Sequence, residues 1–158
     1  MDEHANFYVD LVLMHDELEI IWGDKIPTPI EKGYPKLFND MVYWVLFADD
    51  TPIAYTSSLM QPNRRFVLVG NTYVHSKWRS KGLHTHLLKE RNKSEHMKGI
   101  PKVTVLNPIE KSKMKNLVSV VSKLGYTQVE SYSDAKDIMT PSEYSDLYLE
   151  NQQIWRLS

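Results

Sequence analysis

The amino-terminal stretch carries apolar residues in a pattern that fits two secondary structures. From residue 7 to residue 21 they recur at alternating steps of four and three, which is the spacing of one helix face. Over residues 7–13 every second residue is also apolar, as in a strand. We predict a helix over 12–22 and leave residues 5–11 open between the two structures. Residues 23–40 contain three prolines and two glycines and are expected to form a loop with at most a short helix.

Three apolar runs follow, each bounded by turn residues. They are "MVYWVLFA" (41–48), "IAYTSSLM" (53–60) and "FVLVGNTYV" (66–74). The first run is rich in β-branched and aromatic residues, and the turn sequences "DDTP" and "QPNR" separate the three. We therefore predict three antiparallel strands, of which the first two form a hairpin.

Helical and strand patterns alternate in the second half of the chain. The predicted elements are a helix over 83–97, a strand over 102–106, a helix over 110–125 and a strand over 126–132. Gly99 and Gly125 follow the two helices, where glycine commonly ends a helix. A strand that crosses over to a parallel neighbour almost always does so right-handedly, so the alternation predicts parallel pairing in the sheet.

The tail adds one more helix and a last strand. Thr140 precedes Pro141 and stands three residues before Glu143, which is the pattern of a capping box with proline at the first helical position. We predict a helix over 141–150 and a strand over 152–157. The fold class is therefore α+β, or mixed α/β, around one sheet.

Composition and charge narrow the class of protein. A length of 158 residues fits one domain over 1–158, and 42% hydrophobic with 25% charged residues is typical of soluble proteins. A net charge of −1 argues against a general nucleic-acid binder. The absence of cysteine excludes disulfides, thiolate metal sites and a cysteine nucleophile. The acidic beginning of the chain is unlike a signal peptide, and no apolar run could span a bilayer, so we expect no membrane contact and a cytoplasmic location.

One loop carries the clearest candidate chemistry. Residues 78–84, "WRSKGLH", join a strand to a helix, and Lys77, Arg79 and Lys81 make this region basic. The first N–H groups of a helix have no intrahelical partner, and the helix dipole favours an anion beside them. A phosphate or pyrophosphate suits such a loop, although a solvated basic turn has the same composition. The phosphate loop of nucleotide hydrolases and the dinucleotide fingerprint are both absent.

Residues 74–88, "VHSKWRSKGLHTHLL", resemble the central motif of the GNAT superfamily of N-acetyltransferases, which is Arg/Gln-x-x-Gly-x-Gly/Ala. Arg79, Gly82 and His84 occupy its three defined positions. The later sequence "VSKLGY" (121–126) is similar to the Leu-Gly-Phe/Tyr turn that ends a helix in that family. The resemblance covers roughly residues 41–132.

The resemblance implies a GNAT-like fold that binds acetyl-CoA. The fold would be one central, mostly antiparallel mixed sheet with a parallel, splayed pair of fourth and fifth strands, flanked by helices. Backbone groups of Tyr73 and Val74 would contact the pantetheine arm. The residues expected around the pyrophosphate and at the helix start are Arg79, Ser80, Lys81, Gly82, Leu83, His84 and Thr85. A Cβ at Gly82 would crowd an approaching phosphate.

The sequence departs from the family pattern where chemistry would be carried. His84 replaces a small residue, and Val121 stands where family members often have a tyrosine that acts as general acid. The run "FVLVGNTYV" (66–74), which corresponds to the family's fourth strand, also lacks the glutamate that some members use as a base. No catalytic residue is therefore assigned. The polar residues expected near the cleft are Asn71, Thr72, Tyr73, Ser119 and Ser122.

Three functions remain open at this point. The first is an N-acetyltransferase that passes an acetyl group directly from acetyl-CoA to a primary amine of a small-molecule or peptide acceptor, which the sequence does not identify. The second is a non-catalytic acyl-CoA-binding or regulatory protein with the same fold. The third is a partner-binding module that uses the aromatic sheet and the acidic residues of an insert over 133–151.

The insert and the histidines also have simpler interpretations. The acidic residues of the insert are Asp134, Asp137, Glu143, Asp146 and Glu150. They either flank a cationic acceptor or belong to an ordinary surface helix. His84 and His86 are two residues apart and lie on different faces of a helix, so no metal site is expected. The oligomeric state is left open, a homodimer being one option.

Overall fold

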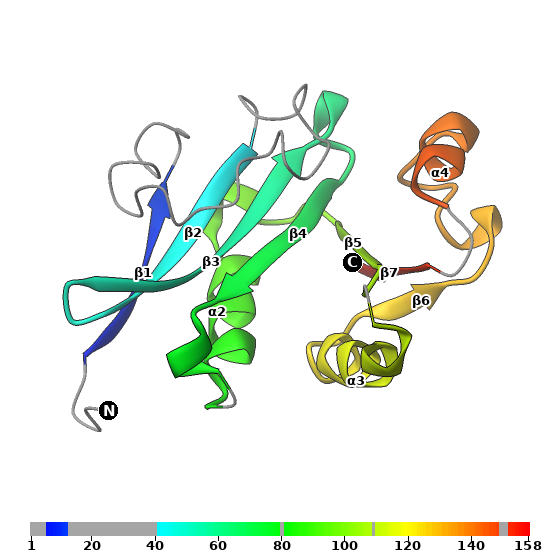
Figure 1. Cartoon of the computed structure of the whole chain (residues 1–158). Helices are drawn as coiled ribbons and strands as arrows, with labels where there is room; N and C mark the ends of the chain where they lie inside the picture. Colours follow the sequence, from blue (N-terminus) through cyan, green and yellow to red (C-terminus); the bar gives the residue numbers. More distant parts are fainter. Residues whose placement is uncertain (1–5, 13–40, 80, 109, 149–151) are drawn as a thin grey trace. The chain divides into compact units, whose positions relative to one another are not determined.

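The computed structural model describes residues 6–12, 41–79, 81–108, 110–148 and 152–158 (Figure 1). The chain forms two compact units, Met1–Leu59 with Gly70–Ser94, and Met60–Val69 with Glu95–Ser158. Its strands form one mixed sheet in the hydrogen-bonded order β1-β2-β3-β4-β5-β7-β6. The predicted fold class is confirmed. The single domain over 1–158, with a variable amino-terminal helix and loop over 1–40 and an acidic insert over 133–151, stays a prediction.

The first strand settles the ambiguity at the amino terminus. β1 (Phe7–Val12) is a strand that pairs antiparallel with β2 (Met41–Ala48), so a helix that begins at residue 12 is wrong. Tyr8 faces Phe47 across the pair, and their rings stack with centroids 4.9 Å apart. A partner far away in the sequence decides the structure, because the periodicity of this stretch fits a helix and a strand equally well. The rest of the predicted helix, and the predicted loop over 23–40, lie outside the described residues.

The predicted hairpin is present. β3 (Thr51–Met60) pairs antiparallel with β2 and begins two residues earlier than predicted, because Thr51 already pairs with Ala48. In the turn between them, Asp49 N–H donates to the Asn6 carbonyl at 2.7 Å, and Asn6 N–H donates to Asp49 Oδ1 at 3.0 Å. The turn therefore also fixes the chain where it enters β1.

β4 (Val67–Val74) leads through a 3-10 turn, η4 (Ser76–Trp78), into α2 (Leu83–Asn92). The helix begins where predicted and ends five residues early, and a 3-10 turn, η5 (Glu95–Met97), follows it. The buried residues of α2 are Leu83, Leu87, Leu88 and Arg91. Their spacing along the chain is that of one helix face.

The second unit contains the predicted parallel pair. β4 and β5 (Lys102–Leu106) are parallel, with Val67 opposite Lys102 and Leu68 opposite Val103. β7 (Gln153–Leu157) lies between β5 and β6 (Thr127–Val129) and is antiparallel to both. The expected splay of the fourth and fifth strands concerns residues of different units and stays a prediction.

The helix predicted over 110–125 is a 3-10 turn, η6 (Lys111–Lys113), continued by α3 (Met114–Lys123). Gly125 follows the end of α3 as predicted. The Gly125 N–H donates to the Ser122 carbonyl at 3.1 Å, and the Tyr126 N–H donates to the Val121 carbonyl at 3.0 Å, so both bonds close the helix end. β6 is shorter than predicted, because Ser131 forms a capping box that begins the 3-10 turn η7 (Tyr132–Asp134).

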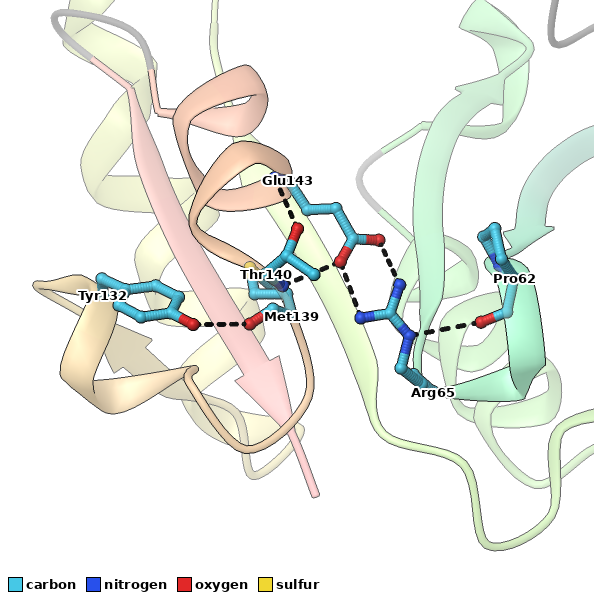
Figure 2. A network of polar contacts seen from close by, with 6 residues as sticks. All are labelled: Pro62, Arg65, Tyr132, Met139, Thr140 and Glu143. Atoms are coloured by element: carbon cyan, nitrogen blue, oxygen red, sulfur yellow. Dashed lines mark hydrogen bonds and ion pairs between the residues drawn. The ribbon is translucent and has the colours of Figure 1, made fainter.

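α4 (Pro141–Leu147) begins at the predicted capping box. Thr140 Oγ1 accepts the Glu143 N–H at 3.2 Å, and Glu143 Oε1 accepts the Thr140 N–H at 2.8 Å (Figure 2). The Glu143 carboxylate also binds Arg65 through two contacts of 2.8 and 2.9 Å. The helix stops at Leu147 because Tyr148 is extended, so the predicted helix end at residue 150 is too late.

Three acidic residues of the insert have structural partners. Asp137 binds Arg156 through two contacts of 2.7 and 3.0 Å, and Asp134 accepts two backbone N–H groups. Glu143 binds Arg65, as described above. These contacts favour the interpretation of the insert as an ordinary surface element, and a role toward an acceptor stays a prediction.

Candidate functional site

The loop between β4 and α2 is anchored at its beginning by neighbouring strands. His75 N–H donates to the Ile53 carbonyl of β3 at 2.8 Å, and His75 Nδ1 accepts the Lys77 N–H at 3.2 Å. The Trp78 ring meets the Phe7 ring of β1 edge-on, with centroids 5.9 Å apart. The sheet therefore determines where the loop starts and in which direction it leaves.

Gly82 immediately precedes α2 in a left-handed conformation. Its φ of 76° is one that L side chains rarely adopt. A Cβ built at this position would meet no heavy atom within 4 Å, so space alone does not require glycine. The left-handed backbone conformation favours glycine here. The expectation that a Cβ at Gly82 would crowd a bound phosphate stays a prediction.

The first turn of α2 presents backbone donors that the helix does not use. The first helical hydrogen bond runs from His86 N–H to the Gly82 carbonyl at 3.1 Å, so the N–H groups of residues 83–85 precede the bonded part. This turn contains no acidic residue, and the exposed Lys81 lies just before it. The Leu83 side chain is buried, so it offers a ligand only its backbone. This arrangement favours an anion at the helix start.

Arg79 folds back onto the end of β4. Its Nε–H donates to the Val74 carbonyl at 2.8 Å, and its guanidinium carbon lies 5.7 Å from the centre of the Tyr73 ring. The structure thus brings together three of the predicted cofactor residues at the point where the strand ends. Ser80 lies outside the described residues.

His84 is half-buried and lies in the field of a buried cation. Burial, and after it the positive charge of Arg91, lowers the pKa of the His84 imidazole below its ordinary 6.5. His84 is therefore neutral at pH 7 and adds no charge to the basic loop. Arg91 is only 3% exposed, and its guanidinium donates to Thr56 Oγ1 at 2.8 Å and to Asn92 Oδ1 at 3.2 Å. The sequence spacing placed Arg91 on the buried helix face without indicating this role.

A cluster of buried hydroxyl groups on β3 accompanies Arg91, and the apolar pattern of the strand does not predict it. Thr56 Oγ1 is 2.8 Å from Thr72 Oγ1, and Ser57 Oγ donates to the Gly70 carbonyl at 2.8 Å. Ser58 is 1% exposed, and its Oγ has no hydrogen-bond partner among the described residues. The run "TSS" in an otherwise apolar strand is the only sequence signal for this cluster.

The other polar candidates lie on two elements, β4 and α3. Thr72 is engaged with Thr56, and the Tyr73 ring packs 5.7 Å from that of Tyr55. Ser119 and Ser122 are exposed on α3, in the second unit. Asn71 lies in β4. Val121, at the family's tyrosine position, is buried in an apolar cluster of α3, β5 and β7. The catalytic residues stay unassigned.

The described part of the chain contains neither a metal-binding cluster nor a membrane-spanning helix. There, no three histidine, aspartate or glutamate side chains are grouped in a way that could hold a metal ion. No helix within those ranges is both long and apolar enough to cross a membrane.

Comparison with known proteins gives a family and a fold. The family model "Acetyltransferase (GNAT) family" matches residues 13–105, which is more than half of the 158 residues. No curated protein sequence matches the chain.

Solved structures with similar folds include several acyltransferases. An acyl-CoA N-acyltransferase from Pseudomonas aeruginosa is 15% identical, with a TM-score of 0.62 over 97% of this chain and 100% of that one. An IAA acetyltransferase from Bacillus cereus is 11% identical, with a TM-score of 0.63 over 96% and 99%. Diaminobutyrate acetyltransferase from Paenibacillus lautus, solved with L-2,4-diaminobutyric acid and coenzyme A, is 10% identical, with a TM-score of 0.59 over 96% and 94%. At these identities the similarity shows the fold alone.

Proposed function

Because the chain belongs to the acetyltransferase (GNAT) family, we propose that it transfers an acetyl group from acetyl-CoA to a primary amine of a small-molecule or peptide acceptor. The observation that carries this proposal is the junction of β4 and α2, where a left-handed glycine and unused backbone donors follow a basic loop. The proposed CoA-binding residues are Tyr73, Val74, Arg79, Ser80, Lys81, Gly82, Leu83, His84 and Thr85.

The charge of CoA fits this junction. The N–H groups of residues 83–85 would donate to the pyrophosphate, and the helix dipole adds to their effect. Lys81 and Arg79 would supply positive charge beside those donors. Burial and the charge of Arg91 lower the pKa of His84, so its backbone N–H is the group that we propose toward the pyrophosphate.

Direct transfer of the acetyl group requires only the amine, the thioester and groups that carry protons. The neutral amine attacks the thioester carbonyl and forms the new C–N bond. The tetrahedral intermediate then loses an N–H proton as its C–S bond breaks, and the departing thiolate takes up a proton to leave as the CoA thiol. A backbone N–H near the end of β4 would polarise the carbonyl oxygen. No side chain is assigned as the base, and the proton can pass through water.

One observation favours the second candidate, a non-catalytic acyl-CoA-binding protein. Val121 replaces the family's tyrosine and is 6% exposed within an apolar cluster, so that position offers no acid to the thiolate. Binding and turnover therefore have to be measured separately.

The binding test uses two alanine variants that impose the same backbone strain. Gly82 and Gly99 both have a φ of 76° and open space at the Cβ position, but only Gly82 belongs to the proposed site. We expect Gly82→Ala to weaken acetyl-CoA binding at least about ten-fold in calorimetry, because strain there displaces the helix start. Gly99→Ala should bind like the unaltered chain. Equal losses in both variants, or no binding by the unaltered chain, would contradict the proposal.

Turnover separates the two candidate functions. We expect thiol release from acetyl-CoA with at least one member of a broad panel of primary amines, and loss of this release in Gly82→Ala. Tight binding without release from any amine would support the non-catalytic function instead. The cytoplasmic location and the homodimer rest on the sequence expectations alone.

A further inference from the structure

The peptide group between Val74 and His75, where β4 passes into the candidate cofactor loop, is held from both sides. Its N–H, which belongs to His75, donates to the Ile53 carbonyl of β3 at 2.8 Å. Its carbonyl, which belongs to Val74, accepts the Arg79 Nε–H at 2.8 Å. The peptide bond is trans, so its N–H and its carbonyl point in opposite directions. Arg79 therefore holds the edge of β4 that faces away from β3.

The Arg79 guanidinium also lies at the end of a series of aromatic rings that crosses three neighbouring strands, β2, β3 and β4 (Figure 1). Tyr43 and Tyr55 are buried, and their ring centroids are 6.1 Å apart. The Tyr73 ring follows, 5.7 Å from that of Tyr55, and the Arg79 guanidinium lies over it at 5.7 Å. A cation is attracted to the face of an aromatic ring. Arg79 is exposed, but two contacts thus fix its side chain on the strand end.

Arg79 connects the two regions that are proposed to bind different parts of the cofactor. Tyr73 and Val74 are the residues proposed to offer backbone groups to the pantetheine arm, and Arg79 contacts both of them. Arg79 itself belongs to the loop proposed to bind the pyrophosphate. A reacting group must be held in a narrow range of orientations for efficient transfer. The position of the strand end therefore affects the acyl arm directly.

We propose that Arg79 is a positioning residue, which fixes the end of β4 for the acyl-pantetheine arm in addition to supplying charge beside the phosphates. The role rests on the proposed function, because it concerns the same cofactor. A side chain that acts only through its charge affects only ligands that are charged themselves. A side chain that fixes the strand end affects every ligand that uses this end. Acetyl-pantetheine, which has the acyl arm without the phosphates, distinguishes the two roles.

Calorimetry with acetyl-pantetheine and acetyl-CoA tests the proposal on the full chain. Arg79→Met and Lys77→Met each remove one exposed charge from the same loop, and of the two residues only Arg79 contacts the end of β4 in the described part of the chain. We expect Arg79→Met to weaken the binding of both ligands about five-fold or more. Lys77→Met should bind acetyl-pantetheine like the unaltered chain. Both variants should fold because both side chains are exposed, and circular dichroism verifies this.

The outcomes separate this role from the proposed function. Acetyl-pantetheine that binds Arg79→Met as tightly as the unaltered chain, or that binds Lys77→Met equally weakly, would overturn the positioning role alone. An unaltered chain that binds acetyl-CoA but not acetyl-pantetheine would overturn it as well, because the strand end would then hold no arm. An unaltered chain that binds neither ligand would overturn both the proposed function and the positioning role.

Amide hydrogen exchange measures the strand end without any ligand. In Arg79→Met the peptide group between Val74 and His75 is held from one side only, so we expect the amides of residues 73–75 to exchange faster than in the unaltered chain. Lys77→Met should exchange like the unaltered chain. Equal exchange of these amides in Arg79→Met and the unaltered chain would show that Arg79 does not fix the strand end, and would overturn the proposal.

Discussion

His84 and Arg91 show how one buried cation changes its neighbour. Both lie on α2, and the sequence does not show that the charge of Arg91 affects His84. Because the charge of Arg91 adds to the effect of burial, the folded protein binds a proton at His84 less readily than the unfolded chain does. This difference couples the stability of the first unit to pH.

The coupling predicts the direction of the pH dependence. Unfolded His84 takes up a proton near its ordinary pKa of 6.5, whereas the folded protein does so only at lower pH, so stability is full above about 6.5 and falls as the pH drops below it. His84→Asn should therefore reduce the loss of unfolding free energy between about pH 7 and pH 5. Urea unfolding at several pH values measures this loss, with His86→Asn, exposed on the same helix, as the control. The prediction is wrong if His84→Asn and the unaltered chain lose equal stability.

Residues of this kind are also where sequence patterns predict least. An apolar run predicts β3, but Thr56 and Ser57 are satisfied by partners on β4, and Thr56 also by Arg91 of α2, 35 residues away. The periodicity of apolar residues indicates only which face of an element a residue lies on. It does not indicate which distant residue will form a hydrogen bond with it, so the hydroxyl cluster could not be predicted from the sequence.

Elements with local signals were predicted best. The capping box of α4 and the glycine after α3 act over three or four residues, so the sequence shows them directly. β1 has no such signal, because its strand structure depends on β2, more than 30 residues away in sequence. Helix ends were also predicted too late, at α2 and α4, because 3-10 turns and extended residues continue an apolar pattern.

The capping box gives a prediction at the scale of one helix. Thr140→Ala removes the acceptor for the Glu143 N–H and should lower the unfolding free energy by about 1 kcal/mol. Amide hydrogen exchange in α4 should accelerate at the same time. Ser142→Ala, exposed in the same helix, is the matched control and should change stability by less than about 0.5 kcal/mol. Equal effects of the two substitutions would show that the cap does not stabilise the helix.

At the scale of the whole molecule, charge is nearly balanced but unevenly distributed. The net charge is −1, while Lys77, Arg79 and Lys81 concentrate positive charge in one loop. If that loop binds the phosphates of CoA, raising the salt concentration from about 50 mM to about 500 mM should weaken acetyl-CoA binding by screening. Binding of acetyl-pantetheine, which lacks those phosphates, should barely change. Calorimetry at both salt concentrations makes the comparison, and equal salt dependence of the two ligands would place the phosphates elsewhere.

The sheet order shows where sequence reasoning about the whole molecule ends. The alternation of strands and helices predicted parallel pairing in the sheet, and the resemblance to the GNAT superfamily implied that the fourth and fifth strands form the pair, as β4 and β5 do. It did not predict that β7 would lie between β5 and β6. Residues 152–157, "QQIWRL", predict a strand, and only packing decides between which neighbours it lies.

The position of β7 has a consequence for synthesis on the ribosome. β6 is three residues long and pairs with β7, which also pairs with β5, so this part of the sheet is complete only after residues 153–157 have been translated. Most residues of the first unit precede that point by more than 60 positions. The candidate cofactor loop is therefore translated, and can fold, before β7 is available to pair with β5 and β6.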